Sequence, residues 1–359
     1  MNVTTIAALF VRQVRRPAAQ SRCWRSGPGA VSAALATIVI LAAGLARASE
    51  TGDGKTDAAP AAKQDAAASK EQLILDTLPE KYRFPNGSVD QNALVAHEKK
   101  RAEAMNKLLQ TQFKVSETAH YLVLSDTDSS TTSQFVKWCE ALYSSLGALF
   151  GMDAGERVWD GKCMLILFSR RAKFQECAVR LDGHDAKRAG AYFAVESYGP
   201  EEPRLVKILI PMDDKDPRRL QELFAHEGSH AFFELYRRPG RLPLWLHEGL
   251  AEYMTTVNDK SLRPARVIEA TRIAKTGRSI RKVLAAKAGD SLEWGEYCTS
   301  FTLVDCLVTL GKPKFKKFVD ALKDGKEQGA ALTAAYGFNM AELEKQWRTH
   351  VLEYLPKHP

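Results

Sequence analysis

Two short segments, AHEGSH at residues 225–230 and WLHEGLAE at residues 245–252, together contain three histidines and three glutamates. On a helix, His226 and His230 are four residues apart and therefore project from one face, where both imidazoles can bind one metal ion. Glu227 lies between them and is free to act as a base. The His-Glu-x-x-His pattern also occurs by chance, so the second segment is needed to support it.

A third ligand is expected because zinc in a hydrolytic site takes three protein ligands and leaves the fourth position to water. The metzincin pattern would supply a third histidine, but no Gly-x-x-His follows His230. Glu248 lies 18 residues beyond His230, after a loop that contains proline and glycine. A helix over residues 244–257 can return beside the first and bring this carboxylate to the metal. We therefore predict zinc bound by His226, His230 and Glu248.

Glu252 follows Glu248 by one helical turn and faces the same way. A four-coordinate site that keeps a water has no place for a fourth protein ligand. We expect Glu252 instead to accept the second imidazole N–H of His226, which would fix the orientation of that ring. Glu227 is predicted to take a proton from the attacking water and to pass it to the leaving amine.

These motifs resemble the gluzincin metallopeptidases, the thermolysin-like peptidases of the MA clan. The segment from Pro243 to Glu252 is similar to the P-x-W-L-x-E-G-L-A-E segment of exported peptidase-MA-like proteins. The resemblance implies a zinc peptidase with a peptide or protein substrate. It also implies that the substrate binds along a sheet edge, at residues 191–196 or 205–210.

The sequence departs from the thermolysin pattern at His247, which stands in place of an asparagine. We expect His247 to lie beside the site or at the surface rather than to bind the metal. Gly228 is unusual inside a helix, where glycine costs about 1 kcal/mol relative to alanine. No motif identifies the transition-state donor of the family. Tyr297 is the candidate by position alone, and the alternative is a core tyrosine.

The hydrophobic pattern predicts an α+β fold, with a small mixed sheet packed on the zinc-binding helix pair and followed by an all-helical subdomain. Strands are predicted at 120–124, 163–168, 191–196 and 205–210. Helices are predicted at 71–78, 90–111, 131–150, 171–180, 216–236 and 244–257, and then at 264–275, 280–288, 294–310, 313–322, 327–336 and 340–355.

Residues 1–48 are predicted to be a signal peptide. They hold six arginines and no acidic residue, an apolar run from about residue 30 to residue 45, and an A-x-A site at residues 46–48. We expect an exported protein, whether periplasmic, in the cell envelope or secreted. A retained membrane anchor is the alternative, but the apolar run is short for a membrane span.

The remaining chain is divided by composition into four parts. Residues 49–70 have too few apolar side chains to fold and are predicted to be a disordered linker. A helical preface at 71–112, an α+β catalytic subdomain at 113–260 and a helical subdomain at 261–359 are predicted to follow.

The net charge of +8 does not indicate a nucleic-acid partner, because the six arginines of residues 1–48 leave 45 basic residues against 43 acidic ones. We also expect no stable membrane insertion once the signal is removed. Beyond the signal there are five cysteines, an odd number without a C-x-x-C pair. Free buried cysteines are expected, and one disulfide among Cys139, Cys163 and Cys177 is the alternative.

Two other functions fit the same motifs. One is a non-catalytic, zinc-stabilised binding module of the cell envelope, and the other is an amidase that acts on peptidoglycan-type substrates. Zinc binding does not require Glu227, so its presence favours an enzyme.

Overall fold

The computed structural model describes residues 39–42, 71–153, 155–199, 201–214, 216–237 and 240–358. By their contacts, residues 1–33 and residues 34–359 form two separate units. The first unit, most of the predicted signal peptide and the whole predicted linker at 49–70 lie outside the described residues. The domain boundaries predicted within the second unit stay predictions.

The second unit contains a six-stranded mixed sheet in the order β1-β5-β6-β4-β3-β2. β3, β4 and β6 run parallel, whereas β2 is antiparallel to β3 and β5 is antiparallel to β6. The strands are β1 Val39–Ala42, β2 Lys114–Glu117, β3 Tyr121–Ser125, β4 Cys163–Phe168, β5 Tyr192–Ser197 and β6 Arg204–Pro211. All four predicted strands are present, and the expected α+β fold with a small mixed sheet is confirmed.

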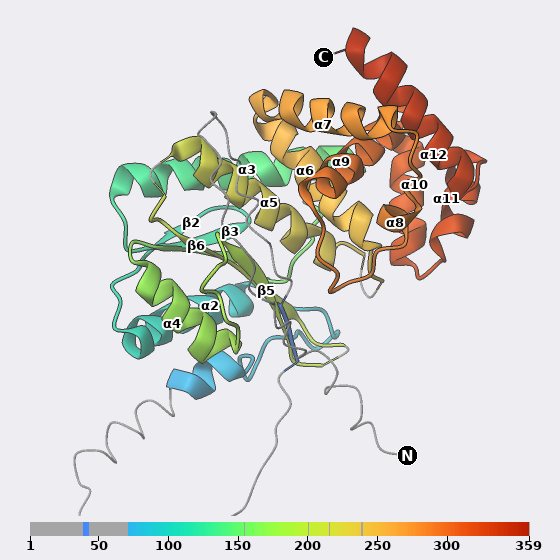
Figure 1. Cartoon of the computed structure of the whole chain (residues 1–359). Coiled ribbons are helices and arrows are strands. Elements are labelled where there is room, and N and C mark those ends of the chain that lie inside the picture. The colour runs from blue at the N-terminus through green and yellow to red at the C-terminus, as the bar shows by residue number, and fades with distance from the viewer. Residues whose placement is uncertain are drawn as a thin grey trace, which may run out of the picture. The chain divides into compact units, whose positions relative to one another are not determined.

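Helices bury both faces of this sheet. Figure 1 shows α3 (Ser129–Phe150) and α5 (Pro217–Leu235) on one side, with α2 (Gln91–Leu109) and α4 (Arg171–Asp182) on the other. Along β4, Leu165 belongs to the core on the α3 and α5 side, whereas its neighbour Ile166 belongs to the core on the opposite side. Two buried faces explain why the strand is apolar throughout instead of alternating.

The two motif helices are α5 and α6 (Leu244–Asn258). Asp216 caps the start of α5 by accepting a backbone N–H, and Pro217 occupies the first helical turn, as the sequence predicts. At the other end of α5 the buried Lys323 donates from Nζ to the carbonyl oxygen of Phe233 at 2.8 Å. A cation at a helix C-terminus stabilises the carbonyl groups that have no partner within the helix.

Two glycines make close packing of these helices possible. A Cβ atom on Gly228 would lie 2.6 Å from Cδ2 of Leu142 on α3, so the glycine makes room for this side chain. A Cβ atom on Gly249 would lie 2.4 Å from the carbonyl oxygen of Ser300. Since Ser300 belongs to α9 (Trp294–Thr309), α6 and α9 are in direct backbone contact at this position.

The chain after residue 262 is helical, as expected. Its helices are α7 Arg263–Lys275, α8 Arg281–Leu284, α9 Trp294–Thr309, α10 Lys312–Lys323, α11 Gln328–Tyr336 and α12 Met340–Thr349. α8 is shorter than the predicted 280–288, since a turn that contains Gly289 at φ +94° follows it. Within the described ranges, no helix combines the length and the hydropathy that a bilayer crossing needs.

Candidate metal centre

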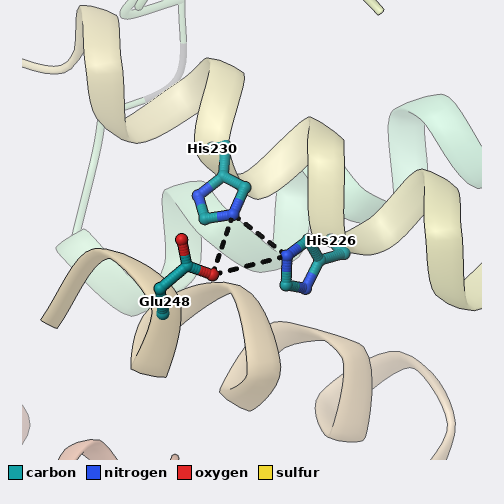
Figure 2. Close-up of side chains that lie close together, drawn as sticks. All are labelled: His226, His230 and Glu248. Atoms are coloured by element: carbon teal, nitrogen blue, oxygen red, sulfur yellow. Dashed lines mark hydrogen bonds and ion pairs between the residues drawn. The ribbon is translucent and has the colours of Figure 1, made fainter. Parts of the chain in front are cut away.

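The three predicted ligands lie together between α5 and α6. Figure 2 shows the imidazoles of His226 and His230 pointing from α5 toward the carboxylate of Glu248 on α6. The two Nε2 atoms are 3.0 Å apart, and Oε2 of Glu248 lies 3.6 Å from Nε2 of His226 and 3.4 Å from Nε2 of His230. The helical spacing and the returning second helix thus produce the arrangement that the sequence predicts.

The spacing of these atoms fits a tetrahedral zinc ion. Ligand atoms about 2.0 to 2.1 Å from zinc at tetrahedral corners are about 3.3 Å from one another, close to the three separations found here. Oε2 of Glu248 is buried and has no hydrogen-bond partner, although a buried carboxylate oxygen normally has one. Two imidazole nitrogens and one carboxylate oxygen are a usual ligand set for catalytic zinc.

Glu252 lies behind the ligands, as predicted. Its Oε1 is 3.2 Å from Nδ1 of His226, and its Oε2 accepts a hydrogen bond of 2.6 Å from Nε of Arg266. Burial opposes ionisation of Glu252, but His226 and Arg266 outweigh it and lower its pKa to about 2. Glu252 is therefore an anion next to Nδ1 of His226, and it is absent from the group of ligand atoms.

Glu227 is buried on α5 next to the ligands, and its Oε2 has no hydrogen-bond partner. Burial raises the pKa of Glu227 to about 7, with a further contribution from Glu248, against the opposing effects of His226 and of the Phe193 backbone N–H. A carboxylate with a pKa near neutrality can both accept and release a proton at physiological pH. This is the property expected of a general base.

The two histidines differ in their protonation. Burial lowers the pKa of His230 well below its ordinary value, and the neighbouring His226 lowers it further. Burial also disfavours the charged form of His226, but the carboxylates around it, Glu252 first, raise its pKa to about 9. Metal binding by His226 must therefore displace a proton.

His247 is buried beside the ligands rather than exposed at the surface. Its ring stacks on that of His230, with centroids 4.3 Å apart, and neither of its nitrogens has a hydrogen-bond partner. Phe193 of β5 lies close to both imidazoles, with its ring centroid 5.7 Å from that of His230 and 6.5 Å from that of His247. His247 thus helps to hold His230 in place and is not among the ligand atoms.

Tyr297 lies at the start of α9, within a small apolar cluster that includes Leu244. Burial raises the pKa of Tyr297, and Glu248, Glu252 and Glu227 raise it further. Three site carboxylates thus disfavour ionisation of this phenol. Its role as transition-state donor stays a prediction.

Three residues that contact the site or its immediate partners are not predicted from the sequence. Arg266 follows Glu252 by 14 residues on a different helix, and Glu222 precedes the His-Glu-x-x-His motif by one turn. Phe193 belongs to a strand that was predicted without any role in packing the ligands. None of them is part of a motif, so only the tertiary structure brings them together.

Comparison with known proteins supports the interpretation of the motifs. Residues 225–353 match a family model described as the Peptidase MA superfamily. The match begins one residue before His226 and covers both motif segments and most of the helices that follow. The resemblance to peptidase-MA-like proteins that the sequence predicts is confirmed over these residues. No curated protein matches the chain.

Two similar solved structures are those of an M1 zinc metallopeptidase from Deinococcus radiodurans and of a mutant of that enzyme. Their sequences are 13% and 12% identical to this chain, and both have a TM-score of 0.38. Each alignment covers 67% of this chain, and 51% and 52% of the other chains. The chain thus spans about half the length of these proteins.

Proposed function

We propose that this protein is a zinc-dependent peptidase in which Glu227 is the general base. The observation that carries the proposal is the cluster of His226, His230 and Glu248, with ligand atoms 3.0 to 3.6 Å apart and a buried glutamate beside them. Zinc binding alone needs only the three ligands. A buried carboxylate beside them that can accept a proton is an additional feature, which a general base provides.

In the proposed mechanism the residues of α5, α6 and α9 have different roles. Bound zinc would polarise the scissile carbonyl and make the attacking water more acidic. Glu227 takes a proton from that water and delivers it to the leaving amine. Glu252 holds the His226 ring at its Nδ1 atom, which leaves Nε2 directed at the metal position. Tyr297 is the proposed donor to the developing negative charge.

The substrate is proposed to bind along β5 rather than β6. β6 lies between β5 and β4 in the sheet and has no free edge. The outer edge of β5 accepts a strand, since β1 pairs with it in parallel from Ala194 to Ser197. β1 belongs to the predicted signal peptide, so removal of the signal would free this edge for a peptide backbone.

The exchange of backbone amides in β5 tests this binding mode. A peptide hydroxamate added to the mature protein should protect those N–H groups of residues 192–197 that point away from β6. Protection confined to α10, α11 and α12 would contradict it.

The decisive test of the function is Glu227→Gln. The variant should fold and bind one zinc ion but lose hydrolysis of a peptide library by about 10² to 10⁴, because an amide cannot accept the proton. Glu98→Gln is the matched control, since Glu98 is also a buried glutamate with a raised pKa but lies on α2, across the sheet. Full turnover by Glu227→Gln would exclude the mechanism.

The same experiments separate the alternative functions. Stoichiometric zinc without cleavage of any peptide would favour a binding module. Cleavage of crosslinked peptidoglycan fragments but not of peptides would favour an amidase. Export is a further part of the proposal and rests on the pattern of residues 1–48. It predicts that the mature N-terminus lies near residue 49.

A further inference from the structure

Arg266 is a buried arginine of α7 that contacts the metal centre from outside the α5 and α6 pair. Its Nε donates to Oε2 of Glu252 at 2.6 Å, and its Nη2 donates to Oε1 of Glu222 at 2.9 Å. Its guanidinium lies over the ring of Trp294, 5.6 Å from the centroid. α7 contains none of the predicted ligands, so this contact links the helical part of the chain to the site.

We propose that Arg266 is a positioning residue of the metal centre, which acts through Glu252 on the orientation of the His226 ring. This inference rests on the proposed zinc site.

The shape of the guanidinium explains how Arg266 can do this. Nε takes only one oxygen of Glu252, Oε2, and leaves Oε1 for Nδ1 of His226 at 3.2 Å. The carboxylate is thus held at both oxygens, and its plane is fixed. A second guanidinium nitrogen, Nη2, donates to Glu222, which lies one helical turn before His226 on α5. A planar guanidinium can hold two carboxylates in one geometry, whereas the single ammonium of a lysine cannot do so with the same directionality.

The outer part of this network also restrains Arg266 itself. Glu222 accepts a second hydrogen bond of 2.7 Å, from Nη1 of Arg219. Nη1 of Arg266 donates to the carbonyl oxygen of Leu262 at 3.1 Å. With all three guanidinium nitrogens engaged and a ring below, Arg266 has one available orientation, and Glu252 is fixed by it.

Arg263 provides a matched comparison on the same helix. It lies three residues earlier, pairs with both oxygens of Asp305 at 2.7 and 3.2 Å, and lies 5.7 Å from the ring centroid of Phe301. Each of the two arginines has an acidic partner and an aromatic neighbour of its own. Of these two arginines, only Arg266 contacts a carboxylate that reaches a predicted ligand. Comparing variants of Arg266 and Arg263 therefore distinguishes an effect on the metal site from a general effect on stability.

The test measures zinc affinity by competition with a chelator, and the absorption spectrum of the cobalt-substituted protein. Arg266→Met should weaken zinc binding by about 10-fold or more, within the range found when the partner of a metal ligand is removed. It should also change the cobalt spectrum, because the His226 ring is released. Arg266→Lys should bind zinc with intermediate affinity. Arg263→Met should leave both the zinc affinity and the spectrum unchanged, even if it lowers stability.

A double-variant cycle distinguishes positioning from a structural effect. If Arg266 acts through Glu252, Arg266→Met should have no further effect on zinc affinity once Glu252→Gln is present. Additive losses, or equal losses from Arg263→Met, would overturn the inference. If Arg266→Met does not fold, Arg266→Lys decides, and wild-type zinc affinity and spectrum in that variant would also overturn it. A wild-type protein that binds no zinc would instead refute the proposed function.

Discussion

Glu98 should make the stability of this protein fall as the pH rises from 5 to 7. The side chain is buried on α2 and accepts the backbone N–H of Lys162 at 3.0 Å. Burial raises its pKa from 4.5 to about 8, against the lowering effects of that hydrogen bond and of Arg101. Between these two values the folded state binds more protons than the unfolded state. The stability that the protonated form provides is therefore complete below pH 4.5 and is lost progressively up to pH 8.

The expected size follows from the shift. Each pH unit in this interval costs up to about 1.4 kcal/mol of unfolding free energy, so the change from pH 5 to pH 7 is roughly 2 to 3 kcal/mol. Glu98→Gln cannot ionise, and its amide oxygen can still accept from Lys162. From pH 5 to pH 7, the free energy of unfolding of the variant should therefore rise by that amount relative to that of the wild type.

Urea unfolding of the mature chain at pH 5, 6 and 7 measures this difference. Glu140→Gln is the control of opposite sign. Burial opposes ionisation of Glu140, but hydrogen bonds from Thr118 and His120 outweigh it and lower its pKa. Removing the Glu140 carboxylate should cost a constant amount of stability from pH 5 to pH 7, because its pKa is below 4.5 when folded and about 4.5 when unfolded, and progressively less only below pH 4.5. Parallel pH profiles for the wild type and Glu98→Gln would refute the reasoning.

Three predictions concern the metal centre. Metal analysis of the mature chain should find about one zinc ion per molecule, and both His226→Ala and Glu248→Ala should lose it; full metal content in both variants would exclude this ligand set. Chelator titration should show that Glu252→Gln weakens zinc binding by roughly 10- to 100-fold, whereas Glu248→Gln nearly abolishes it; equal losses would mean that the two glutamates share one role. Tyr297→Phe should lower kcat by about 10²-fold with little change in KM or zinc content, since a transition-state donor acts mainly on the chemical step; unchanged kcat would identify a core tyrosine.

The predicted strands and helices were recovered because their signals are local. β4 matches its predicted range of 163–168, and α5 begins after the expected Asp216 cap. The missed strand β2 reads Lys-Val-Ser-Glu and is mostly exposed at the sheet edge, so it has no apolar pattern to detect. Its pairing with β3 is the property that defines it, and a single segment of sequence does not show that pairing.

The metal centre was predictable to the extent that its residues follow helical spacing. His226, His230, Glu248 and Glu252 occupy two helices, and four-residue intervals place each pair on one face. The position of Arg266 depends instead on how α7 packs against α9, a contact between segments far apart in the sequence. No periodicity in the sequence specifies such a contact.

The backbone contact at Gly249 limits how this protein can be divided or recombined. Gly249 adjoins Glu248, and a single methyl group there would collide with the Ser300 carbonyl oxygen at 2.4 Å. The distance between the Glu248 carboxylate and the two histidines thus depends on how α6 packs against α9, a helix that supplies no ligand. A fragment ending at residue 260 would retain every predicted ligand but lose the support that fixes their separation. In evolutionary terms, the smallest unit that can be inherited or grafted as a working site extends through α9, and chimeras should join the parent chains after residue 309.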